Sequence, residues 1–151
     1  LGRAFAGDGD YAAVVDKRYT AITRGHPPAH LVLDYAIPRA PGEERVPAVT
    51  ELWCRETIGR YAVVEAAPRT GRLHQIRRHL KHLSCPLIGD VNYGKGEHNR
   101  IFRTEHGLHR LALHAHRLTF PHPVDGRPIT VDAPLADDLV AAIESARRAY
   151  A

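Results

Sequence analysis

Hydrophobic and polar positions along the chain follow two periods. Over 61–66 the side chains alternate, which predicts a strand with its odd-numbered residues on one face and its even-numbered residues on the other. Over 72–83 the apolar residues recur every three or four positions, which predicts an amphipathic helix. The apolar residues of that helix are Leu73, Ile76, Leu80 and Leu83.

Shorter patterns predict the remaining elements. A helix tail is expected over 1–6, and a last helix is expected to open at Pro134, with acids in its early turns and arginines near its end. The glycine-rich stretch 85–107 predicts turns. Further strands are predicted at 18–23, 31–37, 46–58, 111–120 and 129–131. This mixture indicates an α+β or α/β fold around one central sheet.

Composition narrows the class of protein. The 151 residues have the size of one domain, and 44% are hydrophobic, which is enough for a core. No apolar run approaches the roughly 20 residues of a membrane span. Two cysteines without Cys-x-x-Cys spacing predict a reduced, cytoplasmic protein. The chain starts at Leu1 and contains no methionine, so we expect it to be part of a longer protein.

The positive charge is concentrated in one segment. Residues 69–117 hold ten Lys or Arg and three Asp or Glu, a net charge of +7, whereas the rest of the chain carries −3. Such a segment suits a polyanion partner, and the alternative is a solvated face.

The predicted helix over 72–83 presents its basic residues differently. Arg77 falls at the edge of the apolar stripe, so we expect it to be partly buried and to need a carboxylate or phosphate, unless it only extends past the stripe to water. Arg78 falls opposite the stripe and should face solvent, and Lys81 lies on the same outer half. These two are candidates for phosphate contacts.

The eleven histidines raise the question of a metal. His79 and His82 lie one helical turn apart, and His114 and His116 share a strand face, but a zinc site needs three or four convergent ligands. We therefore expect no metal and assign the histidines to the core or to an RNA-facing surface. The glycine-rich run 89–96 lacks a following helix in the predicted pattern, so it is not expected to cradle a phosphate.

Several motifs together carry a family resemblance. Thr70-Gly71-Arg72-Leu73-His74-Gln75-Ile76-Arg77, then Pro86-Leu87-Ile88-Gly89-Asp90 and Tyr93-Gly94, resembles the C-terminal half of RluA-type pseudouridine synthases. Lys17-Arg18-Tyr19-Thr20-Ala21 is similar to that family's Lys-x-Tyr-x-Ala strand. The run Lys95 to Arg100 most resembles the tRNA pseudouridine(65) synthase branch.

The resemblance implies a fold and an activity. It implies a mixed, mainly antiparallel sheet flanked by helices, with 1–151 forming the C-terminal part of a single catalytic domain. The implied reaction converts uridine in RNA to pseudouridine without cofactor or metal, by detaching the base from C1′ and reattaching it through C5. The enzymes flip the target nucleotide into a pocket. A monomer acting on tRNA is expected.

The resemblance also implies site residues. Tyr19 matches the tyrosine that stacks on the flipped base, and Arg77 matches the arginine that pairs with the nucleophilic aspartate. That aspartate belongs to a His-Arg-Leu-Asp motif, which does not occur in this sequence and is expected upstream of it. The expected RNA-binding residues are Lys17, Arg72, His74, Gln75, Arg78, Lys81, Lys95 and Arg100.

Three hypotheses remain open at this point. The first is an RNA pseudouridine synthase, acting on tRNA or on ribosomal RNA, whose isolated 151-residue part is inactive. The second is a non-catalytic RNA-binding remnant of the same fold. The third is a globular domain with an incidental basic face, which the order of the motifs disfavours.

Overall fold

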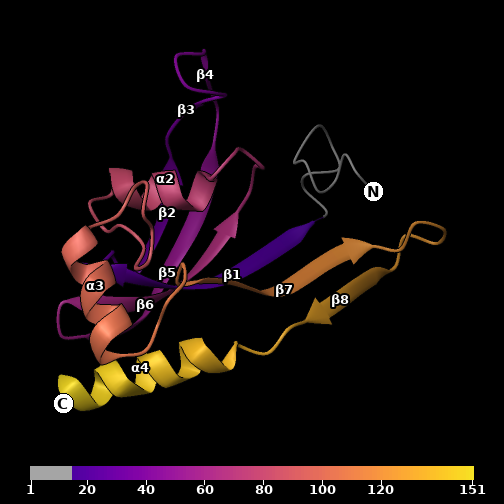
Figure 1. Cartoon of the computed structure of the whole chain (residues 1–151). Helices are drawn as coiled ribbons and strands as arrows, with labels where there is room; N and C mark the ends of the chain where they lie inside the picture. Colours follow the sequence, from indigo (N-terminus) through magenta and orange to yellow (C-terminus); the bar gives the residue numbers. More distant parts are fainter. Residues whose placement is uncertain (1–14) are drawn as a thin grey trace.

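The computed structural model describes residues 15–151 and is built around one six-stranded sheet (Figure 1). The strand order is β2-β5-β6-β1-β7-β8, and every neighbouring pair is antiparallel. The helix tail expected over 1–6 lies outside the described residues. The six strands are β1 (Asp16–Arg24), β2 (His30–Asp34), β5 (Val49–Ile58), β6 (Tyr61–Pro68), β7 (Leu113–Pro121) and β8 (Pro128–Asp132).

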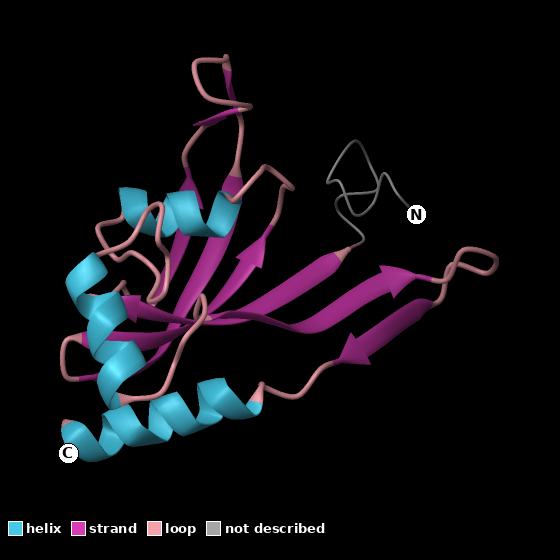
Figure 2. Ribbon diagram, viewed as in Figure 1, coloured by secondary structure: helices cyan, strands magenta, loops and turns pink. Residues whose placement is uncertain are grey.

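Helices cover both faces of the sheet (Figure 2). Helix α2 (Gln75–His82) packs on one face, and helices α3 (Gly96–Glu105) and α4 (Asp137–Ala149) pack on the other. The β7–β8 hairpin extends away from all three helices. The expected mixed α+β fold, with a mainly antiparallel sheet flanked by helices, is confirmed.

The alternation in β6 places its side chains in two separate cores. Tyr61 is fully buried in the core beneath α3 and α4. Ala62 and Val64, on the other face, belong to the core beneath α2, together with Ile76 and Leu80 of that helix. The predicted division of this strand into odd and even faces is therefore confirmed.

Helix α3 was not predicted, and the expectation of turns throughout 85–107 is wrong. Its buried residues are His98 and Phe102, one helical turn apart. The His98 imidazole accepts or donates a hydrogen bond at the Tyr61 hydroxyl, 2.9 Å away. Because a histidine occupies a core-facing position, the apolar period that would have indicated a helix is too short to recognise in the sequence. The glycine-rich run 89–96 consequently does lead into a helix.

Two predicted strands are interrupted. The strand expected over 31–37 divides into β2 and the short β3 (Ile37–Pro38), and the strand expected over 46–58 divides into β4 (Arg45–Val46) and β5. Strands β3 and β4 form a separate two-stranded ribbon. Proline has no N–H to donate to a ladder, and Pro47 lies between β4 and β5. The β3–β4 ribbon extends from the ends of β2 and β5 past one side of α2 (Figure 1).

Within residues 15–151 no helix has the length and apolar character needed to cross a bilayer.

Candidate functional site

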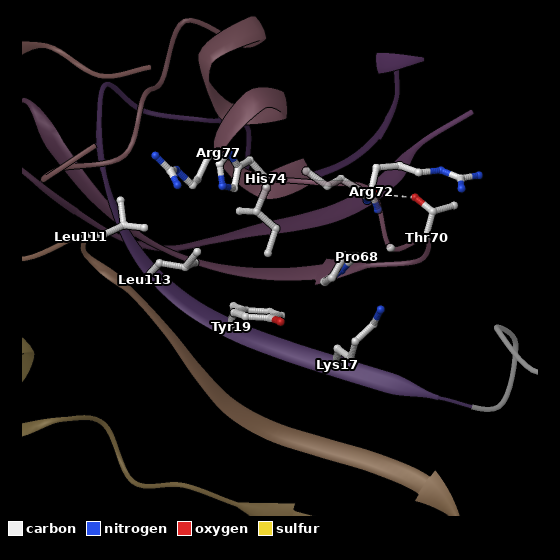
Figure 3. A pocket seen from close by; sticks show the side chains of 12 residues that line it. Lys17, Tyr19, Pro68, Thr70, Arg72, His74, Arg77, Leu111 and Leu113 are labelled. Atoms are coloured by element: carbon white, nitrogen blue, oxygen red, sulfur yellow. Dashed lines mark hydrogen bonds between the residues drawn. The ribbon is translucent and has the colours of Figure 1, made fainter. Parts of the chain in front are cut away.

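A pocket of about 550 Å³ opens where the amino-terminal end of α2 faces strands β1 and β7 (Figure 3). Its floor comes from the sheet, and its rim comes from the loop between β6 and α2. The pocket combines cationic and polar side chains with an apolar base. Its lining residues are Lys17, Tyr19, Pro68, Thr70, Gly71, Arg72, His74, Gln75, Ile76, Arg77, Leu111 and Leu113.

Tyr19 lies on the floor of this pocket. It is paired with Ala66 of β6 and Ala115 of β7, and the ladder with β7 shifts register between Arg18 and Tyr19. Such a bulge re-aims the side chains beside it. Burial raises the pKa of the Tyr19 phenol, so the hydroxyl stays protonated at neutral pH. A flat, half-buried, protonated ring on the floor of a pocket can stack on a planar base.

Lys17 shares the pocket face of β1 with Tyr19 because residues two apart in a strand point the same way (Figure 3). Burial lowers the pKa of its ammonium group. The structure thus brings two of the predicted site residues of β1 together.

Arg77 lies on the helix side of the pocket and is held by Asp90. Its Nε and Nη2 donate to the two carboxylate oxygens of Asp90, each at 3.0 Å. The Arg77 side chain is 16% exposed and that of Asp90 is 0% exposed. The expectation that Arg77 is partly buried beside a carboxylate is confirmed, and the carboxylate in this structure is Asp90. Nη1 takes no part in the pair.

The Asp90 carboxyl group stays ionised although its side chain is buried. Desolvation raises its pKa, but the hydrogen bonds from Arg77 and from the backbone amides of Tyr93 and Asn92 outweigh it, so the pKa lies below its usual value. The same pair raises the pKa of Arg77. Gly94 allows this turn, because a Cβ there would collide with the Asp90 carbonyl oxygen. The turn after Asp90 therefore fixes the orientation of Arg77.

Gln75 does not fit its predicted RNA-binding role. The side chain is 4% exposed, and its amide nitrogen donates to the Val49 carbonyl and the Thr50 hydroxyl. Its amide oxygen accepts from the Thr70 hydroxyl and the Arg72 amide. All four contacts are internal, so Gln75 fixes the pocket rim to the sheet instead of contacting a ligand.

Two neighbours of Gln75 remain accessible. His74 is exposed, has a left-handed backbone (φ 51), and lies with Nδ1 3.3 Å from the Tyr93 hydroxyl. Arg72 donates through Nε to the Pro47 carbonyl. Both line the pocket, which agrees with their predicted grouping around one site.

Arg78 is not directed freely into solvent as the helical wheel predicted. Its guanidinium donates to the carbonyls of Pro38 and Leu73, at 3.1 Å. The β3–β4 ribbon folds against this side of α2, which the pattern of the helix alone does not indicate. Lys81, one turn from Arg77, is exposed and lies with Nζ 5.8 Å from the centre of the Tyr93 ring.

Lys95 and Arg100 lie elsewhere. Lys95 caps the start of α3 and Arg100 lies within that helix; both are exposed, and neither lines the pocket. The structure therefore separates these two predicted RNA-binding residues from the four that line the pocket, which are Lys17, Arg72, His74 and Gln75.

The histidines examined for metal binding have other partners. His79 is buried, with Nδ1 2.7 Å from the Thr50 hydroxyl and Nε2 2.8 Å from the Tyr35 carbonyl. His116 contacts Thr20 and Glu65. Within residues 15–151 no group of three or more metal-ligating side chains converges.

Sequence reasoning missed Asp90 and Tyr93 as site residues. Tyr93 lies with its ring centre 5.2 Å from the Arg77 guanidinium and also contacts His74. The available signal was a single acid followed by a glycine-rich turn inside a basic segment. The apolar base of the pocket, formed by Ile76, Leu111 and Leu113, also went unassigned.

The sequence was compared with those of known proteins. No protein-family model matches the chain. It is 36% identical over 144 residues to a tRNA pseudouridine synthase C of Vibrio parahaemolyticus, covering 82% of this chain and 58% of that protein. It is 42% identical over 98 residues to a ribosomal large subunit pseudouridine synthase D of Xanthomonas campestris, covering 61% and 30%.

The fold is similar to that of solved RNA pseudouridylate synthase structures. The solved structure of human RNA pseudouridylate synthase domain containing 4 superposes with a TM-score of 0.71 at 26% identity, covering 88% of this chain and 62% of that one. Sequence and fold thus define one class of protein, the RNA pseudouridine synthases. The chain has the fold of this class and is similar in sequence to its members. It spans about 58% of the length of the first curated relatives it matches.

Proposed function

We propose that this chain supplies the base-binding pocket and an RNA-binding helix of an enzyme that isomerises uridine to pseudouridine in RNA. One observation carries the proposal. Tyr19 and Arg77, matched to the family's site from separate motifs, line the same 550 Å³ pocket from opposite sides (Figure 3). The flipped uridine would lie between them, with the Tyr19 ring against the base.

Each pocket residue has a task in this proposal. The reaction breaks the bond from N1 of the base to C1′, forms a bond from C5 to C1′, and transfers the C5 proton to N1. Tyr19 stacks on the base and assists removal of the C5 proton. Arg77 holds the nucleophilic carboxylate, using the guanidinium edge that Asp90 does not occupy. Asp90 acts through Arg77 and is a positioning residue.

The nucleophile would come from residues outside the printed sequence. The His-Arg-Leu-Asp motif is absent from the 151 residues. The complete reading frame is the direct place to look: it should encode this motif before the Lys17–Ala21 strand. A reading frame without it would favour the RNA-binding remnant over the enzyme.

The substrate we propose is tRNA. The support is the name of the relatives that match most of the chain, tRNA pseudouridine synthase C. The relative named for the ribosomal large subunit matches a shorter stretch and supports ribosomal RNA as the second candidate. A monomeric state, a cytoplasmic location and a reaction without cofactor are part of the same proposal.

The test uses the protein made from its complete reading frame. The protein is incubated with unmodified tRNA and, separately, with ribosomal RNA, and pseudouridine is mapped by carbodiimide labelling and primer extension. We expect one labelled position in tRNA, lost in Tyr19→Phe and kept in the control variant Tyr150→Phe, whose exposed ring packs on the edge of Tyr61 on the opposite face of the sheet. No labelled position in either RNA would contradict the proposal.

The isolated 151-residue chain gives a complementary result. We expect it to bind tRNA and to form no pseudouridine, because the nucleophile is missing. Turnover by the isolated chain would show that the nucleophile lies within these residues.

A further inference from the structure

A second, smaller groove of about 300 Å³ lies on the outer side of α2, beyond the catalytic pocket. It runs between the helix and the β3–β4 ribbon. Its lining mixes cationic and aromatic side chains, and no carboxylate is among them. The lining residues are Tyr35, Ile37, Pro38, Arg45, Arg78, Lys81, His82 and Tyr93.

The two walls of the groove are connected by hydrogen bonds and by ring stacking. The buried His79 binds the Tyr35 carbonyl through Nε2, and Arg78 binds the Pro38 carbonyl through both terminal nitrogens. The Tyr35 and His82 rings stack with centres 3.6 Å apart. The ribbon is thereby held against the helix at a fixed distance.

Two cationic side chains of the groove, those of Lys81 and Arg45, are available to an anionic ligand. Lys81 and Arg45 are both exposed, and within residues 15–151 neither lies in an ion pair. The Arg45 guanidinium lies 5.3 Å from the centre of the Tyr35 ring and donates to the Ala36 carbonyl. Two cations over aromatic rings, without a competing carboxylate, suit an anionic group attached to a flat ring or sugar.

Tyr93 joins the groove to the catalytic pocket. Its ring centre lies 5.2 Å from the guanidinium of Arg77, which lines the pocket, and 5.8 Å from Nζ of Lys81, which lines the groove. Arg77 and Lys81 are four residues apart in α2, which is about one helical turn or roughly 6 Å along the axis. The pocket and the groove therefore lie next to each other along α2.

We propose that this groove binds the backbone phosphates of the nucleotides next to the modified uridine, with Lys81 and Arg45 as the phosphate ligands. The inference rests on the proposed function, since it needs an RNA in the neighbouring pocket. Base-independent phosphate contacts would position the strand and leave the choice of uridine to the pocket.

The test measures tRNA binding by the protein from its complete reading frame over a series of KCl concentrations. The variants are Lys81→Gln and Arg45→Gln, and the matched control is Arg148→Gln, an exposed arginine of α4 on the opposite face of the sheet. Each groove variant should raise Kd about three- to tenfold and reduce the salt slope by about 0.7–0.9. The thermal midpoint should stay unchanged in both groove variants, which shows that a weaker Kd does not come from a loss of folded protein.

The outcomes separate this inference from the proposed function. If the unaltered protein binds tRNA and both groove variants match Arg148→Gln, the groove is overturned while the proposed function stands. If Lys81→Gln lowers saturated turnover without changing Kd, the groove is likewise overturned, because Lys81 then acts on the pocket through Tyr93. If the unaltered protein binds no tRNA, both proposals fail.

A second measurement does not depend on altered residues. The same protein is crosslinked to tRNA carrying 4-thiouridine at the positions flanking the modified one, and the attached peptides are identified by mass spectrometry. We expect crosslinks on the segments that contain Tyr35, His82 and Tyr93. Crosslinks confined to α4 or to the β7–β8 hairpin would overturn the groove.

Discussion

Two arginine–carboxylate pairs with the same two-pronged geometry lie on opposite faces of the sheet. Arg77 and Asp90 meet at 3.0 Å beside the pocket, and Arg147 of α4 meets Glu56 of β5 at 2.7 Å on the other face. The side chains of the first pair are 16% and 0% exposed, whereas those of the second are 51% and 33% exposed.

The difference between these pairs is one of surroundings. Water screens the Arg147–Glu56 pair, so its closer contacts add little to stability. The Asp90 carboxylate has lost its water and depends on Arg77 and two backbone amides. Contact distance alone therefore does not indicate which ion pair contributes more to stability. Burial makes the pocket-side pair costly to break and well suited to hold a catalytic group in place.

The largest effect on stability is expected from Asp90→Asn. The amide cannot neutralise Arg77, which stays half-buried without its counter-charge, so the free energy of unfolding should fall by about 3 kcal/mol. Glu56→Gln, the matched change on the other face, should cost under about 1 kcal/mol. Urea unfolding at pH 7 measures both. Equal losses would mean that burial does not distinguish the two pairs.

A smaller effect is expected from Gln75→Leu. The change removes four internal hydrogen bonds, while the Val49 carbonyl keeps the Arg69 amide and the Thr50 hydroxyl keeps His79, so the loss should be about 2 kcal/mol. The control is Thr119→Val, which removes one exposed hydrogen bond to Thr130 in the β7–β8 hairpin. If Gln75→Leu is as stable as that control, Gln75 does not fix the pocket rim.

The two pairs should also differ in acid. Both carboxyl groups have a folded-state pKa below the usual value, so each contributes stability that is complete above the unfolded pKa of about 4 and is lost as pH falls through the folded pKa. Asp90→Asn should flatten the fall of the urea midpoint between neutral pH and about pH 2. Glu56→Gln should leave that profile nearly unchanged, and a similar flattening would contradict the comparison.

The sequence predicts regular elements well where one period dominates. The two-residue alternation of 61–66 and the apolar stripe of α2 are sufficient, because both elements bury ordinary hydrophobic side chains. Helix α3 escapes prediction because His98 occupies one of its two buried positions. Its burial depends on Tyr61, 37 residues away, which no local pattern records.

The candidate site shows the same limit. The position of Arg77 at the edge of the stripe predicts its burial and its need for an anion, but not that Asp90, in an irregular turn, meets that need. The helix pattern did not predict the surroundings of Arg78 and Gln75, because their partners come from the β3–β4 ribbon and from β5. Chemistry confined to one helix face can be predicted, while contacts between distant elements need the structure.

The central claim is that Arg77 serves the chemical step and not the binding of RNA. The most direct measurement is tritium release from tRNA labelled at C5 of uridine, with tRNA affinity determined in parallel, for Arg77→Ala and for the matched Arg147→Ala in the protein from its complete reading frame. We predict that Arg77→Ala lowers kcat by at least about a hundredfold with Kd within about threefold, and that Arg147→Ala changes neither. Unchanged turnover in folded Arg77→Ala would contradict the account.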